Sequence, residues 1–364
     1  MAARLRSWQI IDGILLSCFF LITPATVIIS SIANSARQGV QVEAPGAQAE
    51  QKVQAAAQAK QPSRESVERE VHRRLNERPE LGVLVALLFA GFLSLIGLSL
   101  WNLALGGIRL FEGKPFLPKI GRPRGPAWGG REILRIVIAA LLLEQGIVWV
   151  QWTVNWRSGV PLDSSGMTLA ATLAIDGMIF LAAWRLLNRP AVPAADGNGP
   201  RAGRFWPSVR LGMGTYFIFL PMLIIGMILL AAALEWLNHK PEVQPVFEIY
   251  FKEERAAILG WLTLLVAVVG PVAEELFFRG LLYGWLRSRI GIFRGLLVSA
   301  FFFALLHGQV VAFFPILALG LLLGWVYERS GSLAAPIAVH VFHNSGMLFL
   351  AFVIKQLAAG LPIL

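Results

Sequence analysis

Long runs of apolar residues alternate with short polar segments along the 364 residues of the chain. A helix needs about 20 apolar residues to cross the ~30 Å of hydrocarbon in a bilayer. The pattern predicts nine spanning helices, at 10–32, 82–105, 132–153, 168–189, 211–235, 256–283, 293–307, 312–328 and 333–354. The seventh and eighth runs are short, so each is expected either to tilt or to end inside the protein. The predicted fold is an all-α, polytopic transmembrane helix bundle.

The distribution of basic residues agrees with this count and predicts an orientation. With the N-terminus inside, Lys and Arg gather in the inner loops, at 109–131, 185–210 and 287–294. The outer loop 154–167 has one basic residue, and 308–311 has none. Short inner loops of membrane proteins are enriched in Lys and Arg. We therefore expect an integral membrane protein with a cytoplasmic N-terminus.

The N-terminal segment 1–33 is predicted to be a retained signal-anchor helix. Its apolar run is longer than the roughly 7–15 apolar residues of a cleaved signal peptide. The next segment, 34–80, begins as a linker rich in Ala, Gln and Gly and continues as a predicted amphipathic helix. Two interpretations of that helix stay open: a solvated helix beside the membrane, or a helix that binds a partner or dimerises as a coiled coil. The features that predict it are an apolar face and ion pairs at four-residue spacing: Val67, Val71, Leu75, Glu65–Arg69 and Glu70–Arg74.

Composition narrows the function classes. Hydrophobic residues make up 56% of the chain and charged residues 15%, against about 25% charged in ordinary soluble domains. The net charge of +10 does not indicate a nucleic-acid partner, because the basic residues lie in short loops between apolar runs. The single cysteine, Cys18, completes neither an intrachain disulfide nor a thiolate metal site.

The last hundred residues hold an unusual set of polar side chains inside apolar runs. An ionisable group in hydrocarbon costs about 2.5–3.5 kcal/mol on insertion scales, so each one needs a structural or functional reason. Three of the five histidines of the chain are among them. The set consists of Glu274, Glu275, Arg279, His307, His340, His343 and Asn344.

In the first cluster, the two neighbouring carboxylates are expected to have different partners. Glu275 and Arg279 are four residues apart, so they share a helical face and can form an ion pair. Glu274 lies about 100° around the helix and lacks that partner, which favours a role as a general base. Pro271 is expected to kink or open the helix and admit water. The competing interpretation is that all three charged groups form one buried ionic lock between helices.

The second and third clusters also follow helical spacing. Phe303 and His307 share a face, and so do His340 and Asn344. The alternative for His307 is an interfacial residue, and for His340 and Asn344 a hydrogen bond between helices. A simple drawing of hairpins leaves His307 and His340 on opposite sides of the membrane. They can meet only if the seventh run ends at mid-membrane or the predicted spans are shifted.

Taken in order, these clusters resemble the motif set of the CPBP intramembrane proteases: Glu-Glu-x-x-x-Arg, Phe-x-x-x-His and His-x-x-x-Asn. That family includes the eukaryotic Ras-converting CAAX endopeptidase and many bacterial Abi proteins. The resemblance covers residues 256–355 and predicts a protease domain there. The helices of 81–240 match no known pattern and have no predicted role. The resemblance implies the cell (inner) membrane of a bacterium.

The resemblance also implies a role for each motif residue. Glu274 would activate a water molecule that His307 shares, and His340 and Asn344 would stabilise the oxyanion. Glu275, Arg279 and Phe303 would support these groups. No metal is assigned; if a divalent cation such as zinc took part, its ligands would be His307, His340 and Glu274.

The expected function is therefore an intramembrane endopeptidase that hydrolyses membrane-associated peptides or proteins. Two other classes stay open. One is a non-catalytic membrane scaffold with the same fold. The other is a proton-coupled transporter that uses Glu144, Asp176 and Glu274 as a relay, although no internal repeat is visible. The bilayer and a membrane-bound substrate are the expected partners.

Overall fold

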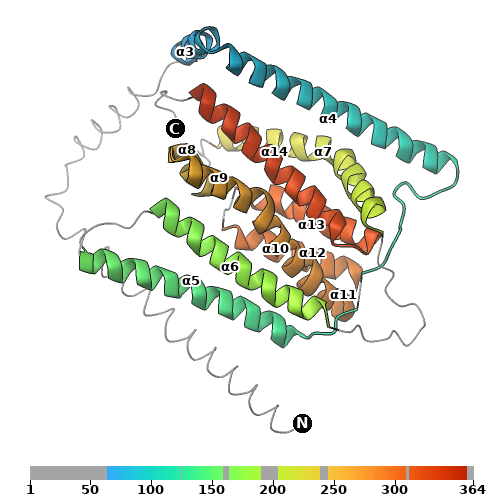
Figure 1. Cartoon of the computed structure of the whole chain (residues 1–364). Coiled ribbons are helices and arrows are strands. Elements are labelled where there is room, and N and C mark those ends of the chain that lie inside the picture. Colours follow the sequence, from blue (N-terminus) through green and yellow to red (C-terminus); the bar gives the residue numbers. More distant parts are fainter. Residues whose placement is uncertain are drawn as a thin grey trace. The chain divides into compact units, whose positions relative to one another are not determined.

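The computed structural model describes residues 64–123, 125–158, 164–189, 204–237, 245–308 and 311–358. Every regular element in these ranges is helical (Figure 1). The predicted all-α class is therefore confirmed for the described part of the chain. The predicted anchor helix at 10–32 and the linker that follows it lie outside the described residues.

The helices follow one another along the chain in a simple order. The first six are α3 (Arg64–Glu77), α4 (Pro79–Phe111), α5 (Gly130–Ser158), α6 (Ser164–Leu187), α7 (Phe205–Trp236) and α8 (Pro245–Lys252). One long interrupted helix comes next, made of α9 (Ala256–Leu264), η1 (Leu265–Val269), α10 (Gly270–Glu275), η2 (Leu276–Tyr283) and α11 (Gly284–Ile290). The last three are α12 (Ile292–Leu306), α13 (Phe313–Ser330) and α14 (Ala334–Ala358).

Among the described residues, seven helices are long and apolar enough to cross a membrane, and the chain is an integral membrane protein. Each of the seven overlaps one of the nine predicted runs. The predicted span at 293–307 corresponds to α12, which has 15 residues. At 1.5 Å per residue it extends roughly 22 Å, less than the hydrocarbon thickness. The described residues therefore do not confirm the predicted count of nine spans.

The sixth predicted run is helical from Ala256 to Ile290 but contains two π-helical segments, η1 and η2. At the end of η1, the Gly270 amide donates to the Leu265 carbonyl, five residues back. The next residue, Pro271, has no amide hydrogen to continue this pattern. The carbonyl of Val266 is consequently left without a helical donor. The predicted opening of the helix at Pro271 thus takes the form of a π-helical turn.

The chain divides into two compact units. The first comprises residues 1–86, 134–171 and 351–364, and the second comprises residues 87–133 and 172–350. Four helices, α4, α5, α6 and α14, continue from one unit into the other. The functional division expected from the sequence, at 1–33, 34–80, 81–240 and 256–355, remains a prediction.

In the first unit, α3 is the amphipathic helix expected in the segment 34–80. The predicted Glu70–Arg74 ion pair is present at 2.9 Å, and Arg73 also binds Glu70 at 2.6 Å. These two guanidinium groups lower the pKa of the exposed Glu70 to about 2, so both pairs persist until the pH approaches that value. Arg74 also donates to the carbonyl oxygen of Gln356 at 3.4 Å, which joins α3 to the end of α14.

In the second unit, α13 packs against both α7 and α12. Its buried face contributes Leu319, Leu322, Leu323 and Val326 to a hydrophobic core cluster that also includes residues of α7 and α14. Small residues allow close approach between helices in membranes. At Gly320, an added Cβ would lie 3.1 Å from Ala300 on α12 and from the ring of Phe303. The helices that carry the polar clusters are therefore held at short range.

A buried carboxylate fixes the C-terminal end of α13. Glu328 accepts hydrogen bonds from Arg287 at 2.7 Å, from the Tyr283 hydroxyl at 2.9 Å and from Lys119 at 3.2 Å. Its side chain is 3% exposed. The adjacent Arg329 donates to two carbonyl oxygens of the loop between α4 and α5, those of Leu117 and Pro118. This network therefore fastens that loop to the end of α13.

We predict that Glu328→Ala destabilises the protein by about 3 kcal/mol, because it leaves the Arg287 charge and the Tyr283 hydroxyl without their common acceptor. Thermal unfolding of the purified protein in detergent measures the effect. Glu112→Ala is the matched control, since Glu112 forms an exposed pair with Lys114 and such pairs contribute at most about 1 kcal/mol. Equal unfolding temperatures for the two variants would contradict the prediction.

Candidate active site

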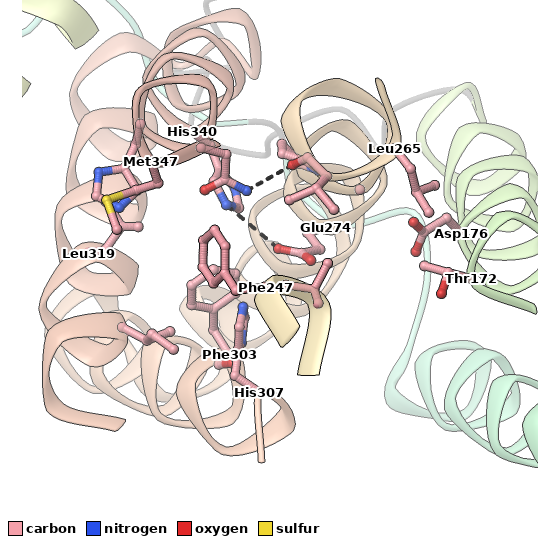
Figure 2. A pocket seen from close by; sticks show the side chains of 17 residues that line it. Thr172, Asp176, Phe247, Leu265, Glu274, Phe303, His307, Leu319, His340 and Met347 are labelled. Carbon is pink, nitrogen blue, oxygen red and sulfur yellow. Dashed lines mark hydrogen bonds and ion pairs between the residues drawn. The ribbon is translucent and has the colours of Figure 1, made fainter. Parts of the chain in front are cut away.

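The second unit contains a cavity of about 300 Å³ among its helices (Figure 2). Its walls come from α6, α8, the interrupted helix at 256–290, α12, α13 and α14. Most of its lining side chains are apolar. The polar ones are Thr172, Asp176, Glu274, His307, His340, His343 and Asn344.

The four predicted catalytic residues all line this one cavity. Glu274 comes from α10, His307 from the end of α12, and His340 and Asn344 from α14. Figure 2 shows Glu274 facing His340, with His307 approaching from the α12 side. The cavity thus joins side chains that are up to 70 residues apart in the sequence. The chemical role of each residue remains a prediction.

The Glu275–Arg279 pair lies behind the cavity wall. The two side chains are 0% and 1% exposed, and Nη1 of Arg279 lies 2.7 Å from Oε1 of Glu275. Arg279 also donates to the carbonyl oxygen of Gly320 at 3.1 Å, and its guanidinium carbon lies 4.3 Å from the ring centre of Phe303. A buried ion pair needs such additional partners to offset the loss of water. The pairing predicted from their four-residue spacing is confirmed.

Glu275 also sets the orientation of His340. The Nδ1 atom of His340 lies 2.9 Å from Oε1 of Glu275. A carboxylate paired with arginine accepts hydrogen bonds, so Nδ1 is the protonated nitrogen in this contact. The other nitrogen, Nε2, points to Glu274 and lies 3.8 Å from its Oε2 atom (Figure 2). The ionic pair thereby holds one edge of the imidazole and turns the other toward the cavity.

Glu274 differs from Glu275 in having no arginine. Its Oε2 atom is buried and has no hydrogen-bond partner, whereas the side chain as a whole is 33% exposed. One part of the carboxylate is therefore accessible from the cavity. A carboxylate with this environment can take a proton from a water molecule there.

His307 lies close to His340, because both imidazoles contact the same aromatic ring. It is the C-terminal cap of the short helix α12. The ring of Phe303 contacts both imidazoles, with centroid distances of 4.8 Å to His307 and 5.7 Å to His340. Nδ1 of His307 donates to the Phe303 carbonyl oxygen at 2.7 Å. In the neutral ring, Nε2 consequently keeps its lone pair.

Asn344 is positioned by the π-helical turn. Its Nδ2 atom donates to the carbonyl oxygen of Val266 at 3.0 Å. This is the carbonyl that Pro271 leaves without a helical donor. This is the hydrogen bond between helices that the sequence offered as the alternative role of Asn344. It uses one of the two amide hydrogens, so the second is left for a ligand.

His343, which had no predicted role, also lines the cavity. Its Nδ1 atom lies 3.1 Å from the hydroxyl of Tyr216 on α7. The two rings meet edge to face with centroids 6.1 Å apart. This contact links α14 to α7.

The sequence analysis did not predict several of the lining residues as site residues, and three of them are informative. Thr172 and Asp176 come from α6, and Phe247 comes from α8, a short helix inside a segment expected to be an outer loop. For Asp176 the signal was present, because it is a carboxylate within an apolar run. It was considered only as part of a transport relay. Phe247 carried no comparable signal.

The conditional zinc ligands do not form a metal cluster in the described part of the chain. Within the described ranges, no three His, Cys, Asp or Glu side chains are arranged to hold a metal ion. His340 binds Glu275 through Nδ1, and His307 binds a backbone carbonyl through Nδ1, so both rings keep Nε2 for another partner. Histidines that ligate metals make the same Nδ1 contacts, so these contacts do not argue against a metal.

We predict that Glu275→Ala greatly lowers the yield and thermal stability of the folded protein, because it strands the Arg279 charge in the core at a cost of about 3–5 kcal/mol. Glu274→Ala is the matched control: it removes a neighbouring carboxylate that has no such pair. Size-exclusion yield and thermal unfolding in detergent measure both. The structural assignment of Glu275 would be wrong if Glu274→Ala were the more damaging change.

Comparison with known proteins identifies the segment that carries these clusters. Residues 256–346 match the family described as "Type II CAAX prenyl endopeptidase Rce1-like". The expected family resemblance is therefore confirmed for this segment, which contains all three motifs. The cavity residues Thr172, Asp176 and Phe247 lie outside it.

A Bacillus subtilis (strain 168) protein named "Putative membrane peptidase YdiL" is similar to part of the chain. The two are 27% identical over 82 residues, which represent 22% of this chain. The matched part spans 34% of the length of that relative. No solved structure matches the chain significantly.

Proposed function

From the premise that residues 256–346 form an Rce1-like type II CAAX prenyl endopeptidase family domain, we propose that the chain is an intramembrane endopeptidase. Its substrate would be a membrane-associated peptide or protein. The single observation that best supports this function is the carboxylate of Glu274, which faces two imidazoles in a cavity of an otherwise apolar domain.

In the proposed first step, a water molecule binds between Glu274 and the Nε2 atom of His307. The carboxylate takes a proton as the water oxygen attacks the carbonyl carbon of the scissile peptide. General acid–base groups of this kind contribute about 10²–10⁴-fold to a rate. The protonated Glu274 then delivers this proton to the leaving amine as the carbon–nitrogen bond breaks.

The oxyanion that forms in this step needs donors on the opposite wall. The second amide hydrogen of Asn344 is one. His340 can donate from Nε2 only as an imidazolium, whose charge the carboxylates of Glu275 and Glu274 flank at 2.9 and 3.8 Å. One such donor typically contributes ~3–4 kcal/mol. Phe303, whose ring meets both imidazoles edge to face and lies beside the Arg279 guanidinium, would keep these groups in place.

The basic loops and the family resemblance support a proposal for the membrane and the orientation of the chain. The chain would cross the cell (inner) membrane of a bacterium with its N-terminus in the cytoplasm. The anchor at 10–32 would add a span to the seven candidate spans of the described residues, and α12 would enter the membrane without crossing it. The domain at 256–355 would carry the catalysis.

We predict that Glu274→Ala lowers the rate of peptide cleavage by at least about 10³-fold, because it removes the proposed base and its proton transfer. The measurement uses purified full-length protein in liposomes and a library of membrane-anchored reporter peptides. Glu144→Ala is the control, since it removes an acidic residue from the apolar helix α5, outside the cavity. Cleavage by Glu274→Ala at the wild-type rate, from protein that is folded normally, would refute the proposal.

Removal of divalent cations should leave the cleavage rate within about twofold of its starting value, because the proposed activation of water uses a carboxylate and an imidazole. The protein is dialysed against a strong zinc chelator and then assayed in liposomes. Metal-stripped buffer is the reference condition. Loss of cleavage that added zinc restores would overturn the metal-free step and leave the peptidase function standing.

A further inference from the structure

Asp176 is a carboxylate in the cavity that the proposed reaction does not use. It lies on α6, in the middle of an apolar helix that is a candidate membrane span. Figure 2 shows it on the α6 side of the cavity, across Glu274 from His340. It belongs to the same compact unit as the other cavity residues and lies outside the matched family segment.

Asp176 lies close to the helix that carries the proposed base. A Cβ atom added at Gly270 would lie 3.5 Å from Oδ2 of Asp176, which is ordinary contact distance. Gly270 is four residues before Glu274, so the two positions share a helical face. The carboxylate of Asp176 therefore rests against the turn directly below the reacting group.

The cavity offers this carboxylate no cation. None of its lining residues is Lys or Arg. Arg279 lies behind the wall, where Glu275 and the Gly320 carbonyl occupy it. Among the described residues, no hydrogen bond or ion pair involves the Asp176 side chain. A carboxylate within an apolar span is costly enough to require a partner, and the partner is commonly part of the function.

We propose that Asp176 is a specificity-determining residue that binds a Lys or Arg side chain of the substrate next to the scissile bond. This inference rests on the proposed peptidase function and defines its substrate class. The cation would neutralise Asp176 and leave Glu274 free to bind water. The apolar lining, which includes Val246, Phe247 and Leu265, would cover the methylene stem of that side chain.

A competing role for Asp176 is to share a proton with Glu274. The two roles differ in a measurable way. A shared proton would affect all peptides equally and would change the pH dependence of cleavage. A binding site for a cation would affect only peptides that carry one, mainly through KM, because the contact forms in the bound substrate as well as in the transition state.

The test compares matched peptides that differ at one position near the cleaved bond, with Lys, Arg, Gln, norleucine or Glu. Purified full-length protein in liposomes is expected to prefer Lys and Arg over Gln by at least about tenfold in kcat/KM, as for one charge-assisted hydrogen bond. Asp176→Asn should reduce this ratio to about one, and Asp176→Glu should keep most of it. Glu144→Gln is the matched control and should leave the ratio unchanged.

A binding measurement separates this inference from the proposed reaction. In the Glu274→Gln background, the Lys peptide should bind about tenfold more tightly than the Gln peptide, and Asp176→Asn should abolish the difference. Absence of cleavage by the wild-type protein would refute the peptidase function, whatever the binding result. Cleavage or binding without a Lys or Arg preference, or an equal effect of Asp176→Asn on all peptides, would refute the role of Asp176. The wild-type peptide series alone decides this if Asp176→Asn does not fold.

Discussion

The fully buried ion pair between Glu275 and Arg279 is the interaction on which the site depends. Its two charges cancel inside the protein, and both side chains also bind neighbouring groups. Glu275 holds the Nδ1 atom of His340, while Arg279 binds the Gly320 carbonyl and covers the ring of Phe303. These contacts connect the interrupted helix to α12, α13 and α14. An apolar pair of similar volume would pack equally well but would orient no imidazole.

The irregular backbone of η1 positions the Asn344 amide, as the ion pair positions the His340 imidazole. In a regular α-helix through residues 265–275, the Gly270 amide would bond the Val266 carbonyl, and that carbonyl would not be offered to α14. The π-helical turn before Pro271 leaves the Val266 carbonyl for Asn344. Non-helical backbone at membrane depth is tolerated where it is buried in protein or lines a wet cavity. The polar cavity and the distorted helix therefore depend on each other.

The structural features that depend only on neighbours along one helix could be predicted from the sequence. Run lengths gave the long helices, and four-residue spacing gave the contacts Glu275–Arg279 and Phe303–His307. Contacts between helices, such as those of His340 with Glu275, have no periodic signature. Hydropathy also predicted a span at 293–307, because apolar composition alone does not show that α12 has only 15 residues. The sequence shows that Asp176 is an energetically unfavourable carboxylate within an apolar run, but only the fold shows which cavity it lines.

Three carboxylates now lie close together with different surroundings, and different surroundings favour different roles. Glu275 binds Arg279 and His340 through Oε1 and is fully buried, so neither water nor a substrate cation can reach it. Glu274 has no arginine partner and lies beside two imidazoles in the cavity, which suits proton transfer. Asp176 faces the same cavity from α6, and no imidazole or guanidinium of the described residues binds it. Because an imidazolium at His340 can balance at most one negative charge, an ionised Glu274 and Asp176 together leave the cavity anionic. A substrate that brings its own cation removes this imbalance without neutralising the base.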